Sequence, residues 1–422
     1  MDAITPLEYY TCHFPYKELA RVLTRNGDAL CQREFALEGD FYKRYVVAKD
    51  WEDLRRQVIA HPGITSLHVG PVYSGRVARS ADHARSWPAR RELVFDIDLF
   101  PDYEWLTLNR ADGSTDMEAC DRAWPVCAIG AFLLQYVLEH AFGFREIVCV
   151  YSGRRGVHLW VCDNAAMGLA DDARGAIVGY VRASLTEDKM RATAALRCFA
   201  ETNQLLPAVR WAFDELFVRE MGLLDPLEQR LSLVDRLDLS QVEGLQGLHE
   251  DVLDVDSGVA AWARVQLKVR DTGQQWIQAK LDEVVLAYVW PRIDENVSLH
   301  RNHLLKACFV AHPKTGRIAS PVDQADLFSF RPAAAPRLSA WSGEAPPACE
   351  PRALPRALPR ARALSHAPAL PRARPRAAAR AGGKGTRRKS PNRPAGRKRS
   401  PLAPQGAAMD VEDLGRALAS PA

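Results

Sequence analysis

Alternating apolar and polar positions predict short strands in the first half of the chain, with amphipathic helices between and after them. The predicted strands cover 42–47, 67–73, 92–99, 147–151 and 157–162, and the predicted helices cover 16–23, 51–61, 128–141, 171–184 and 274–289. In the last helix Ile277, Leu281 and Val284 recur at helical spacing, which is typical of a buried stripe. Residues 164–290 have no strong strand pattern. We therefore predict a mixed α/β core over 1–163 and 291–330, with a helical subdomain inserted over 164–290.

The C-terminal segment 331–422 is expected to be a disordered basic tail. Prolines recur every four residues around Pro355 and Pro359, which blocks helix propagation. Residues 351–400 contain 16 Lys and Arg and no acidic residue. Without this tail, residues 1–350 contain 39 basic and 49 acidic residues, a net charge of −10. The chain therefore combines an acidic body with a basic tail.

Several classes of protein are excluded by composition. No apolar run reaches the roughly 18 to 20 residues that a membrane span needs, and the first residues lack the basic and apolar regions of a secretory signal. The nine cysteines are scattered and none forms a CxxC pair. We therefore expect free thiols, a reducing compartment and no membrane partner.

Two acidic residues interrupt the most apolar of the predicted strands, 92–99. Successive side chains on a strand alternate between its faces, so the carboxylates of Asp96 and Asp98 share one face, with their Cα atoms about 6.6 Å apart. Carboxylates this close repel each other unless a cation lies between them. The pair therefore indicates a metal site; the simpler alternative is an exposed acidic face on an edge strand.

A glycine-rich turn with two arginines, Ser152–Gly156, connects two predicted strands. Glycines permit a tight turn whose backbone N–H groups can approach an anion. Arg154 and Arg155 offer planar donor groups suited to phosphate oxygens, and His158 follows on the next strand. The alternative is a solvated hairpin turn. Beside a pair of carboxylates, a binding loop for a triphosphate is the better interpretation.

A third group of polar residues follows the last predicted helix. Asp294 is a possible third metal ligand, and Lys306 and His312 are possible phosphate ligands. Each signal is weak by itself, because a single Asp after a helix is usually a cap or turn residue. The segment 314–317 is most simply a turn.

Together these motifs resemble the catalytic small subunit of eukaryotic DNA primase, a member of the archaeo-eukaryotic primase superfamily. The matching segments are ELVFDID, VYSGRRGVHLWVCD, PRIDENVS, NHLLK and HPKTGRI, and the similarity extends over about residues 7–330. The resemblance implies an archaeo-eukaryotic primase catalytic core. It implies that Asp96, Asp98 and Asp294 bind two Mg²⁺ or Mn²⁺ ions, and that Glu34 belongs to the catalytic region. The nucleotide-binding residues that it implies are Arg44, Ser152, Gly153, Arg154, Arg155, Gly156, His158, His303, Lys306 and His312.

One departure from the family concerns zinc. The family has four cysteines after the acidic strand, whereas only Cys120 and Cys127 occur here, with Trp124 where a CxxC pair would need its first cysteine. Structural zinc is nearly always bound by four Cys or His ligands. We therefore expect no zinc.

The resemblance implies a DNA-directed RNA polymerase that makes RNA primers for replication from ribonucleoside triphosphates on single-stranded DNA. It implies a nuclear location, an iron–sulfur large subunit and DNA polymerase α as partners. Two alternatives are a stand-alone primase-polymerase or repair polymerase that uses deoxynucleotides, and an inactive replication scaffold. In the tail, 386–389 and 397–399 are basic clusters that suit nuclear import or DNA binding.

Overall fold

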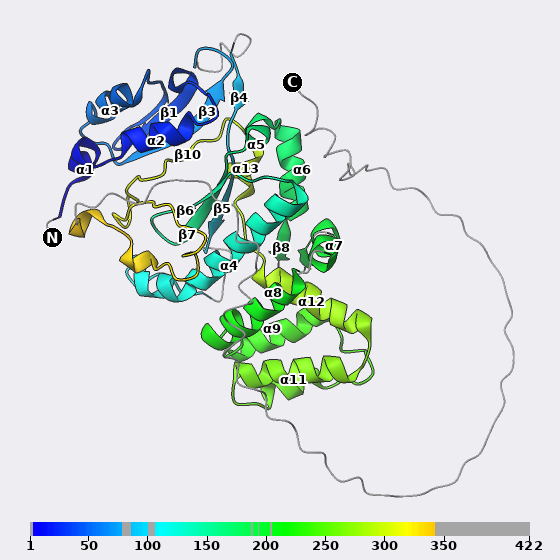
Figure 1. Cartoon of the computed structure of the whole chain (residues 1–422). Helices are drawn as coiled ribbons and strands as arrows, with labels where there is room; N and C mark the ends of the chain where they lie inside the picture. Colours follow the sequence, from blue (N-terminus) through cyan, green and yellow to red (C-terminus); the bar gives the residue numbers. More distant parts are fainter. Residues whose placement is uncertain are drawn as a thin grey trace, which may run out of the picture. The chain divides into compact units, whose positions relative to one another are not determined.

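The computed structural model describes residues 3–77, 86–99, 106–186, 189–192, 194–202 and 205–341. Within them the chain forms both helices and strands, and most of the strands belong to two main β-sheets (Figure 1). The first sheet has the order β10-β3-β1-β2, and β4 also pairs with β3. Its strands are β1 (Arg33–Glu38), β2 (Tyr42–Val46), β3 (Ser66–Tyr73), β4 (Pro88–Arg90) and β10 (Leu305–Lys306). The mixed α/β fold is as predicted.

The second sheet contains the acidic strand and both strands of the glycine-rich hairpin. Its order is β5-β7-β6, with β5 (Leu93–Asp98), β6 (Ile147–Tyr151) and β7 (Gly156–Val161) all antiparallel. Each end of these three strands lies within one residue of its predicted position. The register places Asp96 opposite His158 and Asp98 opposite Gly156. The pairing of β5 with β7 therefore brings the acidic pair next to the end of the loop, where β7 begins.

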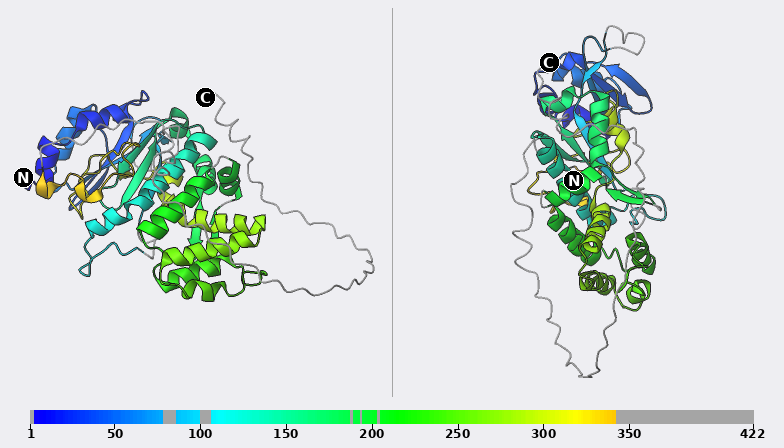
Figure 2. Two further views of the ribbon diagram at one scale, coloured as in Figure 1. Left: turned by 60° about the horizontal axis from the view of Figure 1, so that its bottom comes forward. Right: turned by 90° about the vertical axis from the view of Figure 1, so that its right-hand side faces the viewer.

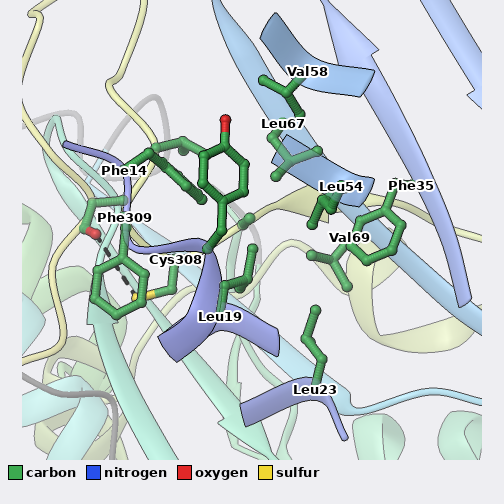
Figure 3. Packing of buried hydrophobic residues seen from close by; sticks show 14 of the residues in the cluster. Phe14, Leu19, Leu23, Phe35, Leu54, Val58, Leu67, Val69, Cys308 and Phe309 are labelled. Carbon is green, nitrogen blue, oxygen red and sulfur yellow. Dashed lines mark hydrogen bonds between the residues drawn. The ribbon is translucent and has the colours of Figure 1, made fainter. Parts of the chain in front are cut away.

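The hydrophobic core lies against the first sheet and continues to the second. Helices α1 (Pro6–Cys12), α2 (Tyr16–Leu23) and α3 (Trp51–Ile59) contribute to this core. Figure 3 shows Leu19 and Leu23 of α2 close to Phe35 and Val69 of the first sheet. Val94 and Trp160 of the second sheet belong to the same buried cluster, so burial of apolar side chains fixes both sheets together.

Residues 164–290 are mostly helical and lie beside the sheets in Figures 1 and 2. The helices are α5 (Asn164–Gly168), α6 (Asp171–Val181), α7 (Ala194–Thr202), α8 (Leu206–Trp211), a π-helix (Ala212–Glu220), α9 (Leu227–Leu237), α10 (Leu248–Leu253), α11 (Gly258–Asp271) and α12 (Gln275–Val289). The predicted stripe on α12 is buried. Although the sequence of this segment has no strong strand pattern, β8 (Ala183–Thr186) and β9 (Lys189–Ala192) form a two-stranded hairpin within it.

Two expectations need correction. The strand β1 was not predicted, because its sequence mixes charged and apolar residues without clean alternation; its side chains are nevertheless almost all buried. The tail was expected to be disordered from residue 331, yet 331–341 pack on the body through two 3₁₀ turns, Pro332–Ala334 and Leu338–Ala340. Leu338 and Trp341 are buried, and the Trp341 ring lies 5.1 Å from that of Tyr9. The rest of the tail lies outside the described residues.

Candidate active site

An aspartate from late in the chain, Asp294, meets Asp96 and Asp98 at the edge of the second sheet. Asp96 and Asp98 lie on β5, and α13 (Glu295–Leu299) follows Asp294. Ile293 forms a β-bridge with Ile97, and the backbone N–H of Asp294 donates to the carbonyl of Asp96 at 2.9 Å. The segment before α13 thus pairs with the edge strand β5 through a single bridge. This pairing brings the third carboxylate to the first two.

The three carboxylates repel one another in the protein. Burial, followed by the charges of Asp98 and Asp294, raises the pKa of Asp96 to about 7. The Asp98 carboxylate accepts from Arg155 Nε at 3.0 Å, and Asp294 accepts from the backbone N–H of Asn296 at 3.0 Å. Among the described residues, no three His, Cys, Asp or Glu side chains already surround a single point as metal ligands. The chemistry of three carboxylates suits hard cations such as Mg²⁺ and Mn²⁺, but binding requires them to reorient.

The loop between β6 and β7 is shaped by its glycines and by Ser152. The Ser152 hydroxyl accepts from the backbone N–H of Gly156 at 3.2 Å, which closes the turn. Gly153 has φ +87°, and a Cβ there would lie 2.8 Å from His312 Cβ. The Thr315 hydroxyl also donates to the Gly153 carbonyl at 2.6 Å. The second glycine-containing turn, 312–317, therefore packs directly on the first.

Four cations gather around His312 where these two turns meet. Burial, and then the charges of Lys306, Arg154, Lys314 and Arg155, lower the pKa of His312 to about 3. Burial and the charge of Lys306 likewise lower the pKa of His158 to about 4. The cluster therefore favours an anion. The sequence pattern at 314–317 predicts only a turn and does not reveal the part of Lys314 in this cluster; the available signal is its position two residues after His312.

Arg154 and Arg155 are held in place by side chains from outside the loop. Arg154 Nε donates to the Thr115 hydroxyl at 2.8 Å. Arg155 is buried and bridges the loop to Asp98, as described above, and also lies 3.5 Å from Asn109 Oδ1. The ion pair between Arg155 and Asp98 joins the cationic cluster to the acidic one, so both belong to a single site.

Glu34 lies on β1 of the first sheet and anchors Arg44. Its fully buried carboxylate accepts from Arg44 Nε at 2.8 Å and from the Tyr73 hydroxyl at 3.1 Å. Arg44 also donates to the carbonyl of Asn302 at 3.3 Å. Burial is the main cause of a lowered pKa at His303, which is within electrostatic range of Asp294 and Arg44. These contacts make Glu34 a positioning residue for Arg44.

The region where the family has its zinc cysteines is helical in this chain, and its residues do not fit a zinc site. Cys120 and Cys127 both lie on α4 (Met117–Ala141), which begins well before its predicted start at 128. Seven residues of helix separate them by about 10 Å, too far for two ligands of one zinc ion. Burial raises the pKa of Cys120 to about 11, which disfavours a thiolate ligand. Instead, Trp124 packs 4.9 Å from the Phe330 ring and donates to the Leu327 carbonyl.

The protein thus has a mixed α/β core, and its site sets an acidic sheet edge beside a cationic cluster formed by two packed turns. The family model "DNA primase small subunit" matches residues 95–324, more than half of the chain. The chain therefore belongs to the DNA primase small subunit family, that of the catalytic subunit of primase.

Relatives from eukaryotes and archaea support this assignment. The DNA primase small subunit of Schizosaccharomyces pombe is 29% identical over 366 residues, which cover 80% of this chain and 77% of that protein. The DNA primase small subunit of Caenorhabditis elegans is 29% identical over a match that covers 78% of this chain and 84% of that protein. The DNA primase small subunit PriS of Haloarcula marismortui is 28% identical over a match that covers 57% of this chain and 61% of that protein. The names of these relatives describe them as small subunits, which implies that each of them has a large subunit as partner. Within the described residues, every helix is too short or too polar to cross a membrane.

Proposed function

We propose that this chain synthesises short RNA primers on single-stranded DNA by two-metal-ion nucleotidyl transfer. The observation that carries the proposal is the register of β5 with β7, which sets Asp96 opposite His158 and Asp98 opposite Gly156. This register supports the proposal, because it sets the carboxylates that we propose as metal ligands directly beside the residues that we propose as phosphate ligands. A nucleoside triphosphate with bound metal ions presents positive metal ions and negative phosphates side by side, which complements this arrangement.

Asp96, Asp98 and Asp294 would hold the metal ions. When bound, two Mg²⁺ or Mn²⁺ ions would activate the attacking 3′-hydroxyl and neutralise the leaving pyrophosphate. With metal ions bound, Asp98 would serve as a metal ligand, and Arg155, which pairs with Asp98 here, would be able to donate to a phosphate oxygen instead. Arg154, Lys306 and Lys314 provide further positive charge in the same place, where it stabilises the charge that develops on the phosphates.

The remaining residues orient the nucleotide. His158 and His312, which have lowered pKa values, are neutral at physiological pH and can donate hydrogen bonds without adding charge. Arg44 is held by Glu34 and, with His303, borders the site next to Asp294. We assign Ser152, Gly153 and Gly156 to shaping the loop, so that its arginines face the acidic edge.

We further propose that the chain acts in the nucleus, together with an iron–sulfur large subunit and DNA polymerase α. The eukaryotic relatives support the nuclear role. The acidic body gives little long-range attraction for DNA, so we assign template affinity to the partner subunits or to the basic tail.

Primer synthesis with ribonucleotides and with deoxynucleotides tests the proposed substrate. The purified chain, alone and with its large subunit, is given a single-stranded template and either NTPs or dNTPs. We expect primers from NTPs. Products from dNTPs alone would indicate a repair polymerase, and no product from either, with the large subunit present, would indicate a scaffold.

A further inference from the structure

The motif that contains Asp294 continues with Val297 and Ser298, to which the proposed function assigns no role. Ser298 is fully buried on α13, and its hydroxyl donates to the carbonyl of Val94 on β5 at 2.6 Å, across 204 positions of sequence. Val94 lies two residues before Asp96 on the same strand. The hydroxyl thus joins the helix of the third carboxylate to the strand of the other two.

A second contact holds the C-terminal end of the same helix. Arg91, which is 1% exposed, donates through one terminal nitrogen to the carbonyls of Val297 at 2.9 Å and His300 at 3.1 Å. These carbonyls belong to the last turn of α13, where a cation is favourable. Arg91 is itself two residues before the start of β5.

The backbone of Arg91 is also fixed. The buried guanidinium of Arg174, on α6, donates to the carbonyls of Arg91 and Glu92 at 2.5 and 3.2 Å. Arg33 pairs with the Glu92 carboxylate through two bonds, at 2.9 and 3.0 Å. The residues that lead into β5 are thus tied to α6 and to the first sheet.

These contacts connect α13 and β5 along their lengths. The bond from Asp294 N–H to Asp96, the bond from Ser298 to Val94 and the bonds from Arg91 to the end of α13 together form what we term the α13 clasp. A helix of five residues has little stability by itself, so its orientation depends on the clasp. The direction of the Asp294 carboxylate depends on it in turn.

We propose that Ser298 and Arg91 are positioning residues that set the third carboxylate against the acidic pair, and so determine how tightly the site binds its divalent cation. This inference rests on the proposed metal-binding role of Asp96, Asp98 and Asp294. A role confined to stability would lower the melting temperature but leave the cation affinity of the folded protein unchanged.

The test measures binding of Mn²⁺ to the full-length chain by electron paramagnetic resonance, well below the melting temperature, which is recorded separately in EDTA. The main variant is Ser298→Ala. Its matched control is Ser66→Ala, because Ser66 is also fully buried but its hydroxyl has no hydrogen-bond partner among the described residues. Both variants delete one buried hydroxyl, and they differ in whether that hydroxyl holds α13.

We expect Ser298→Ala to bind Mn²⁺ about 3- to 10-fold more weakly, which corresponds to about 0.7 to 1.4 kcal/mol. Ser66→Ala should bind like the wild type, and Ser298→Thr, which keeps the hydroxyl, should restore most of the affinity. Arg91→Lys keeps the charge with shorter reach and should also weaken binding, which provides a second variant should Ser298→Ala not fold.

Each outcome bears on one claim. Wild-type affinity in both Ser298→Ala and Arg91→Lys, or equal losses in Ser298→Ala and Ser66→Ala, would overturn the positioning role. The proposed metal site is tested separately by Asp294→Asn. If that variant binds Mn²⁺ as tightly as the wild type does, the metal assignment itself fails.

Discussion

Adding a single methyl group at Gly156 should impair catalysis more than it impairs the fold. A Cβ at this position would lie 2.5 Å from the carbonyl oxygen of Ile97 and 3.3 Å from the Cα of Asp98. Both neighbours are backbone atoms of β5, so no side chain can rotate away. To reach a normal carbon–oxygen distance of about 3.3 Å, β5 and β7 must separate by nearly 1 Å next to Asp98.

The overlap should affect both the stability of the fold and the rate of nucleotide addition. Overpacking of this kind costs about 1 to 3 kcal/mol of unfolding free energy. A displacement of about 1 Å at a reacting group can cost about 100-fold in rate. Gly156→Ala should therefore melt at a somewhat lower temperature and lose about 100-fold in nucleotide addition.

Gly179→Ala is the matched control for this change. Gly179 lies within α6, and a Cβ there meets nothing within 4 Å, so alanine should stabilise the helix by about 0.5 to 1 kcal/mol. Both variants are compared by thermal unfolding and by extension of a primed template with NTPs. Full activity in Gly156→Ala would show that the close approach of β7 to Asp98 does not matter for the site.

Four further predictions concern charge, metal content and the tail. Because the pKa of Asp96 is raised to about 7, its ionisation destabilises the metal-free fold as pH rises from about 4 to 7. The free energy of unfolding of Asp96→Asn should therefore exceed that of the wild type by up to about 4 kcal/mol at pH 8 but not at pH 4, as measured by denaturant titration in EDTA. Equal free energies of unfolding at pH 8 would contradict this. Arg155→Ala should weaken NTP binding by about 10-fold or more with little effect on template DNA, and a loss confined to DNA affinity would refute its phosphate role. Elemental analysis should find no stoichiometric zinc, whereas one zinc per chain would require ligands other than Cys120 and Cys127. Deleting 382–400 should reduce nuclear accumulation of a tagged chain but leave primer synthesis intact, and a deleted chain that makes no primers would show that the tail supplies template affinity.

Local patterns were sufficient for the acidic strand and the hairpin. The alternation in 92–99 and the two glycines beside paired arginines are consequences of strand and turn geometry, which act over a few residues. Gly156 is required for a reason other than turn geometry. Its backbone approaches β5 too closely for a Cβ, and its φ is not positive. That approach is a tertiary contact, which no local pattern contains.

The rest of the site depends on contacts between distant segments. Asp294 reaches Asp96 through pairing of Ile293 with Ile97, and Lys314 joins the cations because its turn packs on Gly153. The burial of Leu338 and Trp341 likewise depends on α1 and on Gly316, so composition alone made 331–341 resemble the remaining tail. Burial against partners from elsewhere in the chain overrode the local signal in each case.

The most direct test of the account asks whether the acidic pair and the third carboxylate form one site. Nucleotide addition is measured for Asp96→Asn, for Asp294→Asn and for the double variant, all assembled with the large subunit on single-stranded template. Residues that act as a unit have strongly non-additive effects. We predict that each single change lowers the rate at least 1,000-fold and that the double variant is no slower than either. Near-normal activity in Asp294→Asn, or losses that multiply in the double variant, would contradict a shared site.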